Sequence, residues 1–406
     1  MTVAPPGPSS PSAAPSAAAA PLFAPLAVGS LAVPNRIVMA PMTRELSPGG
    51  VPGRAVARYY ARRAEHAGLV ITEGTVIDHP ASSTSTAVPR FHGQDAIDGW
   101  ADVVRAVHKA GGRIAPQLWH VGLDPLLWGT SPARSSRAMP SGVAPVSPSG
   151  VDPSAQDGLR DAADGADGGA QGGVVGHRLT ESEIADLIGS FARAAAVARR
   201  IGFDAVELHA AHGYLVDQFF WEVTNRRTDR YGGDLAGRTR FAAEIVRACR
   251  RAVGPGFPII LRFSQWKVGH YKARLARDPN LLAAFLEPLA DAGVDVFHCS
   301  TRRFWEPEFP GSRLNLAGWT KKLTGRPTIT VGSVGLRDSD FLTYLEGKGA
   351  VPDAIDAVAE RLERGEFDLV AVGRALIADP AWPAKIRTGR HEELVAFEAD
   401  MLKTLD

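Results

Sequence analysis

The chain has 406 residues, 45% of them hydrophobic, so it is long enough for one large α/β barrel or two ordinary domains with a sizeable core. Its 45 basic and 44 acidic side chains nearly cancel, which argues against a nucleic-acid or anionic-lipid partner. Two cysteines are too few for a disulfide framework or an iron–sulfur cluster. No apolar run approaches the ~18 residues needed to span a bilayer, and we expect a cytoplasmic protein.

Two stretches differ in composition from the rest of the chain. Residues 1–20 are rich in Ala, Pro and Ser and contain no Lys or Arg, which fits neither a secretory signal nor a transit peptide and predicts a disordered tail. Residues 152–176 are rich in Gly, Asp and Ala, and we expect them to form a mobile surface insertion. The remaining chain is expected to form a single domain at 21–395, followed by a C-terminal extension at 396–406.

Strand-like and helix-like patterns alternate along this domain. Apolar, β-branched runs mark eight expected strands at 36–41, 69–77, 113–118, 205–208, 258–263, 294–299, 328–331 and 369–372. Amphipathic segments between them predict helices at 55–67, 97–110, 181–200, 235–253 and 281–292. Thr180 with Glu183 forms a capping box, and Asp98 signals another helix start. This order predicts a closed (β/α)8 TIM barrel, whereas a doubly wound sheet is disfavoured because no G-x-G-x-x-G follows any strand.

The fourth expected strand runs directly into two histidines and a tyrosine: His209, His212 and Tyr214. In a TIM barrel, catalytic groups lie at this end of a strand. The residues alone leave three interpretations open, namely hydrogen-bonded core histidines, an acid–base site, or a metal site for hydrolysis built from Glu207, His209 and His212. The metal site is disfavoured because His212 would have to turn back to join the other two, so no metal is expected.

Glycines after the last two strands predict a phosphate site. Gly332 and Ser333 follow the seventh strand, and Gly373 and Arg374 follow the eighth. Backbone N–H groups can approach a phosphate closely at glycine, and arginine can bind it with two hydrogen bonds. The alternative is that both glycines only make tight turns. A flat heteroaromatic ring attached to that phosphate would be lined by residues 41–43, Gln117 and Arg262.

Eight motifs, in order, resemble those of the Old Yellow Enzyme family: VPNRIVMAPMTR, EGTVI, QLWHVG, ELHAAHGYLVDQF, RTDRYGG, LRFS, VGSVG and VGRALIADPAW. The resemblance covers about residues 22–390 and implies an FMN-containing (β/α)8 barrel that reduces activated alkenes with NAD(P)H. The family pattern allows either His or Asn at the second position of the pair, so His212 is within it. Thr43 groups the chain with proteins that resemble the yeast and plant members.

The resemblance also implies which residues bind FMN. Thr43 would donate a hydrogen bond to the flavin O4, Gly74 would let backbone approach the ring, and Gln117 would pair with its pyrimidine edge. Arg262 would place positive charge near N1 and O2, where the reduced flavin carries negative charge. The full expected set of FMN contacts is Ala40, Pro41, Met42, Thr43, Gly74, Gln117, Arg262, Gly332, Ser333, Gly373 and Arg374.

The same resemblance assigns the catalytic steps. His209 and His212 would donate hydrogen bonds to a substrate carbonyl, which becomes enolate-like as hydride passes from flavin N5 to the β-carbon. Tyr214 would protonate the α-carbon, since a tyrosine phenol, with a reference pKa of about 10, keeps its proton at neutral pH. Without a separate dinucleotide fold, NAD(P)H would use the same histidines in turn, which implies ping-pong kinetics. A flavin-binding dehydrogenase or sensor barrel is the alternative.

Two aromatic side chains, Trp119 and Phe304, are expected to contact the substrate. Trp119 follows the third strand and would form a pocket wall. Phe304 lies in a loop at 300–309 with Arg302 and Arg303, and that loop either covers the pocket or is an ion-paired surface loop. The expected partners are a small activated alkene and a nicotinamide nucleotide, and a homo-oligomer is compatible with the outer surface of such a barrel.

Overall fold

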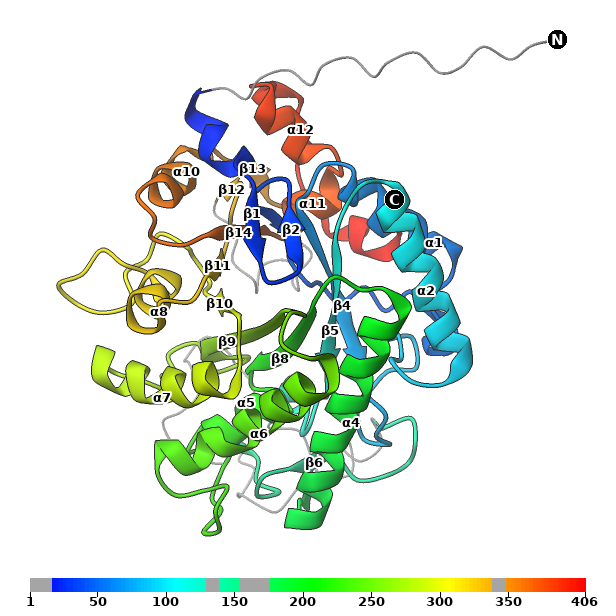
Figure 1. The fold of residues 1–406 in the computed structure, drawn as a ribbon, viewed down its shortest axis with the longest axis vertical. Coiled ribbons are helices and arrows are strands. Elements are labelled where there is room, and N and C mark those ends of the chain that lie inside the picture. Colours follow the sequence, from blue (N-terminus) through cyan, green and yellow to red (C-terminus); the bar gives the residue numbers. More distant parts are fainter. Residues whose placement is uncertain (1–16, 129–138, 154–175, 338–347) are drawn as a thin grey trace.

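The computed structural model describes residues 17–128, 139–153, 176–337 and 348–406. Eight parallel strands close into a barrel in the order β10-β11-β14-β3-β4-β5-β8-β9, with helices around it (Figure 1). They are β3 (Ile37–Met39), β4 (Leu69–Val76), β5 (Ile114–Trp119), β8 (Val206–His212), β9 (Ile259–Lys267), β10 (Val296–Ser300), β11 (Thr328–Val331) and β14 (Leu369–Val372). Each predicted strand overlaps one of these, so the predicted TIM barrel is confirmed and the doubly wound sheet is wrong.

Amphipathic helices cover the outside of the barrel. They are α1 (Arg54–Ala64), α2 (Gln94–Lys109), α4 (Glu181–Ile201), α6 (Leu235–Val253), α7 (Pro279–Ala292), α8 (Leu316–Thr324) and α10 (Asp356–Glu363). The predicted capping box begins α4: the Thr180 side chain accepts from the Glu183 N–H, and the Glu183 carboxylate accepts from the Thr180 N–H at 2.7 Å. The helix start predicted at Asp98 is wrong, because α2 begins earlier, at Gln94, and Asp98 lies exposed within it.

Shorter elements form the connections. They are η1 (Ala17–Phe23), η2 (Pro48–Gly50), η3 (Pro125–Leu127), α5 (Leu215–Phe220), α11 (Arg374–Ala378), α12 (Trp382–Arg387), η5 (His391–Glu393), η6 (Ala399–Lys403) and the strand pairs β1 (Leu26–Val28)–β2 (Leu31–Val33), β6 (Val146–Ser147)–β7 (His177–Arg178) and β12 (Leu336–Arg337)–β13 (Val351–Pro352). The helix η1 begins within the predicted tail, whereas residues 1–16 and 154–175 lie outside the described residues. Among the helices of the described ranges, none is both long and apolar enough to cross a bilayer.

The interior of the barrel is layered because alternate residues of a strand face the same side. The layer at the amino ends of the strands is apolar and includes Ala115, Ala205, Ile260 and Val296. The hairpin of β1 and β2 closes this end, since Leu31 and Val33 belong to the same buried cluster. Two residues further along the strands, the interior becomes polar, with Gln117, Glu207, Arg262 and His298. Two residues further still come Trp119, His209, Ser264 and Ser300. The amino ends of the strands therefore supply stability, and the carboxyl ends supply polar groups.

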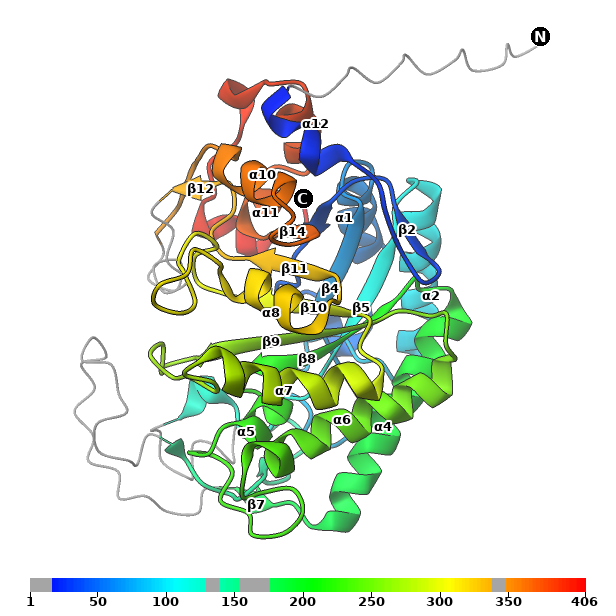
Figure 2. The same cartoon turned by 60° about the vertical axis from the view of Figure 1, so that its left-hand side comes forward.

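The C-terminal segment packs against the carboxyl side of the barrel. The Arg44 guanidinium donates to the carbonyl of Met401 at 2.9 Å and also to that of Thr404. Arg63 on α1 donates to the carbonyl of Asp406 at 2.7 Å, so the end of the chain lies beside α1 (Figures 1 and 2). The segment thus contacts the loop that follows β3, which carries Thr43.

Candidate active site

The two histidines converge at the end of β8. The predicted strand ended at Leu208, but β8 continues to His212 through an irregularity in its pairing with β9. His212 has a positive φ of 67°, a conformation that turns its side chain away from the regular alternation. The His209 and His212 rings lie 5.3 Å apart at 86°. The structure therefore places the His209 and His212 side chains next to each other, which their spacing in the sequence did not predict.

Burial sets the protonation of both imidazoles. It lowers the pKa of His209 and of His212 well below the usual range, and the positive charge of Arg262 lowers both further. Each ring is consequently neutral near neutral pH and carries one N–H donor. Within the described residues, no hydrogen-bond partner reaches Nδ1 of His209, which is buried.

Tyr214 packs against the histidines and Trp119. Its ring is 5.1 Å from that of His209 and 4.9 Å from that of Trp119, in both cases edge to face. The Trp119 and His209 rings are stacked, with centroids 6.2 Å apart. Trp119 thus contacts two of the three candidate catalytic residues, as a pocket wall would.

A buried ion pair supports the turn between His212 and Tyr214. Lys267 Nζ lies 2.7 Å from Asp217 Oδ1, and both side chains are 0% exposed. The other oxygen of Asp217 accepts from the Gly213 N–H at 2.7 Å. Burial raises the pKa of Asp217 to about 6, although Lys267 opposes the rise. The pair therefore fixes the backbone between the two candidate donors.

The polar layer contains a chain of hydrogen bonds across three strands. Gln117 Nε2 donates to one oxygen of Glu207 at 2.7 Å, and Nδ1 of His298 lies 2.6 Å from the other oxygen. Because Nε2 is the donor in this contact, the orientation of the Gln117 amide is fixed, and its carbonyl oxygen and second proton remain for a ligand. Both carboxylate oxygens of Glu207 are thus engaged in hydrogen bonds with Gln117 and His298. The described residues contain no group of three or more His, Cys, Asp or Glu that could hold a metal ion.

Arg262 supplies a buried cation next to this chain. Its side chain is 8% exposed in β9, and burial lowers its pKa while the charge of Glu207 raises it. A guanidinium nevertheless stays protonated in proteins. Its Nη2 donates to Ser300 Oγ at 3.4 Å, and its Nε has no partner among the described residues. A flat ligand with acceptor atoms along one edge would satisfy this group.

The loop after β3 is held by Glu73. Its carboxylate accepts from the backbone N–H groups of Arg44 at 2.8 Å and Glu45 at 3.1 Å. Burial raises the pKa of Glu73 to about 7, and these two hydrogen bonds lower it. Ala40 and Pro41 are buried, Met42 is half-buried and the Thr43 side chain is exposed. Glu73 thus holds the backbone immediately after Thr43.

Gly74 makes room for Trp119. A Cβ at this position would lie 2.6 Å from Cε3 of the indole. We expect Gly74→Ala to displace Trp119 and to destabilise the protein by about 1–3 kcal/mol, as overpacking does. Thermal unfolding measures the effect, with Gly256→Ala as the control because nothing lies within 4 Å of its added Cβ. Equal stability of the two variants would show that the site relaxes without cost.

The two glycine loops lie at the ends of neighbouring strands, β11 and β14. Gly332 and Ser333 both have positive φ, of 146° and 51°, and a Cβ on Gly332 would stand 2.7 Å from the carbonyl oxygen of Thr301. Gly373 directly precedes α11, which begins at Arg374. The tight turn at Gly332 and the proximity of the loops fit the predicted phosphate site.

Phe304 is placed differently from the other candidates. It is buried in the core, its N–H donates to the carbonyl of Gly332 at 3.1 Å, and its ring contacts the exposed Trp305 at 5.2 Å. Neither histidine nor Tyr214 is among its ring neighbours in the described residues. Phe304 therefore contacts the Gly332 turn through its backbone, and the substrate contact expected of its ring stays a prediction.

Trp266 and His298 were not expected near the histidines from the sequence, and Ser300 was expected only as the first residue of the loop at 300–309. The Trp266 ring stacks on that of His212, 4.4 Å away at 26°. His298 and Ser300 occupy the same face of β10 as Val296 in the apolar layer. A count in steps of two from Val296 would have found His298, whereas Ser300 and Trp266 lie beyond the predicted ends of their strands.

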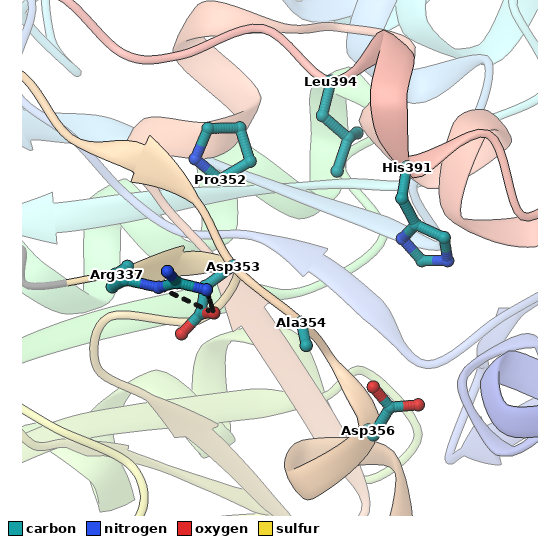
Figure 3. A pocket seen from close by; sticks show the side chains of 7 residues that line it. All are labelled: Arg337, Pro352, Asp353, Ala354, Asp356, His391 and Leu394. Carbon is teal, nitrogen blue, oxygen red and sulfur yellow. Dashed lines mark hydrogen bonds and ion pairs between the residues drawn. The ribbon is translucent and has the colours of Figure 1, made fainter.

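A hollow on the outside of the molecule is separate from these residues. It is lined by Arg337, Pro352, Asp353, Ala354, Asp356, His391 and Leu394 (Figure 3). Arg337 is paired with Asp353 at 3.2 Å in that hollow. None of the candidate residues lines it.

Comparisons with known proteins identify relatives that match most of this chain. Residues 21–393 match the family described as NADH:flavin oxidoreductase / NADH oxidase. The chain is 41% identical to 12-oxophytodienoate reductase 7 of Oryza sativa subsp. japonica, over 89% of this chain and 86% of that protein. It is 35% identical to an NADH oxidase of Thermoanaerobacter brockii over 92% of this chain, but it spans only 52% of the length of that relative.

Solved structures show the same architecture. Morphinone reductase in complex with tetrahydroNAD superposes with a TM-score of 0.69 and 31% sequence identity, covering 91% of this chain and 90% of that chain. Both the family match and the structural superposition confirm the resemblance to the Old Yellow Enzyme family. The chain belongs to the NADH:flavin oxidoreductase / NADH oxidase family, known as the Old Yellow Enzyme family, whose members use FMN with NAD(P)H.

Proposed function

We propose that this protein is an FMN-dependent ene-reductase that uses NAD(P)H to reduce activated alkenes, meaning α,β-unsaturated carbonyl compounds or nitroalkenes. The observation that carries the proposal is the convergence of His209, His212 and Tyr214 at the carboxyl end of the barrel. Two of the similar proteins are named as reductases of 12-oxophytodienoate and of morphinone, which supports this substrate class.

The polar layer would hold FMN. Arg262 and Gln117 offer an unpartnered Nε and a fixed amide to the acceptor edge of the ring, and Thr43 is exposed on the loop after β3. Gly332, Ser333, Gly373 and Arg374 would hold the phosphate. When bound, FMN takes up hydride from NAD(P)H and supplies it to the alkene. These donors and the buried charge of Arg262 fit that group, because they match a planar ring that gains negative charge on reduction.

The histidine pair would bind and polarise the alkene. Both rings are neutral, so each can donate one hydrogen bond to the same carbonyl or nitro oxygen. These donors strengthen as negative charge builds on that oxygen, and they are held in place before the reaction begins. The pair therefore lowers the barrier for addition of hydride to the β-carbon.

Tyr214 would complete the reaction by donating the proton to the α-carbon. Its ring is held between His209 and Trp119, so its hydroxyl is directed by packing on two sides. The backbone before it is fixed by Asp217 through Gly213. Such a positioned general acid contributes on the order of 10² to 10⁴ in rate.

Anaerobic half-reactions test the proposal. The purified holoenzyme is expected to be yellow, to bleach when NAD(P)H is added, and to regain its colour when an enone is added after the nicotinamide has been consumed. Because both substrates would use the same histidines, initial-rate plots against each substrate are expected to be parallel, as in ping-pong kinetics. Bleaching without reoxidation by any enone, nitroalkene or maleimide would point to the dehydrogenase or sensor alternative, and intersecting plots would contradict the shared site.

A further inference from the structure

Ser300 connects the cation of the polar layer to the histidine pair. Its side chain is 3% exposed at the end of β10. Its Oγ lies 2.8 Å from Nε2 of His212 and accepts from Nη2 of Arg262 at 3.4 Å. These are the hydrogen bonds found for this hydroxyl in the described residues, and the proposed mechanism gives it no role.

The donors and acceptors around Ser300 Oγ determine which ring nitrogen of His212 carries the proton. A guanidinium can only donate, so Ser300 Oγ is the acceptor on the Arg262 side. If Nε2 of His212 also carried a proton, the buried hydroxyl would face two donors and its own proton would lack an acceptor among the described residues. A buried donor without an acceptor destabilises the arrangement, because the hydrogen bond that it made to water is not replaced. If Nε2 is unprotonated, Ser300 donates to it and every group is satisfied.

We propose that Ser300 is a positioning residue that holds His212 in the tautomer with its proton on Nδ1. The Nδ1–H then becomes the donor that His212 offers to the substrate oxygen. This inference rests on the proposed function for the role of that donor, but the tautomer itself is a property of the resting enzyme. It is also the opposite of the tautomer that histidine favours in water, so a specific contact must impose it.

The ring of His212 is held by contacts that do not involve the Ser300 hydroxyl. Trp266 stacks on it, with ring centroids 4.4 Å apart, and the Trp266 Nε1–H donates to the backbone carbonyl of Ser300 at 3.1 Å. The backbone N–H of His212 donates to Ser264 Oγ at 2.9 Å. Removing the Ser300 hydroxyl should therefore release the tautomer while leaving the position of the ring nearly unchanged.

Nitrogen NMR of the FMN-loaded enzyme with isotope-labelled histidine reads the tautomer directly. The His212 signals are assigned by their loss in His212→Asn. In the wild-type protein we expect a protonated Nδ1 and an unprotonated Nε2, and in Ser300→Ala a shift of population toward the Nε2–H form. Ser300→Thr keeps a hydroxyl at the same place and is expected to restore the wild-type pattern. A wild-type signal from Nε2–H, or an unchanged tautomer in Ser300→Ala, overturns the proposal.

Measuring enone reduction beside the tautomer distinguishes the proposed role of Ser300 from the proposed ene-reductase function. In Ser300→Ala we expect enone reduction to slow at least on the order of 10-fold, because one donor of the pair is no longer enforced, with recovery in Ser300→Thr. The NMR measurement needs neither substrate nor turnover. A wild-type enzyme that has the Nδ1–H tautomer but no alkene reductase activity would therefore contradict the proposed function without contradicting the role of Ser300. If Ser300→Ala does not retain FMN, the wild-type and Ser300→Thr spectra still decide.

Discussion

Replacing Tyr214 with phenylalanine is expected to slow the reduction of an enone by on the order of 10² to 10⁴ while sparing the reduction of the flavin by NAD(P)H. The reason is that only the alkene half-reaction needs a proton at carbon. The Phe ring can keep the edge-to-face contacts with Trp119 and His209, so the change removes the hydroxyl alone. Stopped-flow absorbance of the two half-reactions measures both rates separately.

Two comparisons make this result specific. A nitroalkene should remain a good substrate for Tyr214→Phe, because its nitronate product is a stable anion that can leave without a proton. Tyr231→Phe serves as the control, since that hydroxyl donates to Glu244 at 2.8 Å on the outer helix layer and should affect neither half-reaction. If Tyr214→Phe slowed enone and nitroalkene equally, Tyr214 would be a binding residue and the proton would come from elsewhere.

Lys267→Met is expected to destabilise the folded protein by about 3–5 kcal/mol at pH 8, because it leaves the Asp217 carboxylate buried without its partner. Both groups of the pair are 0% exposed, so neither can turn to water without local unfolding. Urea unfolding of the FMN-loaded protein measures the loss. Lys403→Met is the control, because its pair with Asp400 is exposed and should change stability by less than about 0.5 kcal/mol.

The same variant should show a defined dependence on pH. The pKa of Asp217 in the folded wild type is about 6, above its value of about 4 in an unfolded chain, and loss of Lys267 raises the folded pKa further. Between the unfolded and folded pKa values the folded state binds more protons, so stability falls as pH rises through this window. The deficit of Lys267→Met should therefore be small at pH 5 and largest at pH 8, and adding Asp217→Asn should remove much of it. A deficit independent of pH would mean that packing rather than charge is lost.

Periodicity allowed much of the fold to be predicted from the sequence. The runs at 328–331 and 369–372 coincide with β11 and β14, because short buried strands between glycine turns have clear ends. The ends of β8 and β9 were placed too early, since both strands continue as polar residues: β8 reaches His212 and β9 reaches Lys267. Tertiary pairing between these two strands sustains the extended backbone there, and a single-strand pattern does not contain that information.

Strand periodicity also allowed part of the candidate site to be predicted from the sequence. The alternation from Ala205 through Glu207 to His209 places all three on the inner face, and the family motifs carry the expected ligand residues. Ser300 could not be linked to His212 from the sequence, because their contact depends on the positive φ of His212 and on the neighbouring strands β9 and β10. The Lys267–Asp217 pair was missed because charged residues are rarely fully buried, so their default interpretation is an exposed surface.

The hairpin of β1 and β2 has a consequence for how substrates compete. Because Leu31 and Val33 close the amino end of the barrel in the described residues, a molecule near the buried polar layer would enter and leave through the carboxyl end in the proposed reaction. Each substrate then obstructs the access of the other. An excess of alkene would hold the oxidised enzyme in a dead-end complex, and an excess of nicotinamide would do the same to the reduced enzyme, so the rate of turnover would pass through a maximum as either concentration rises.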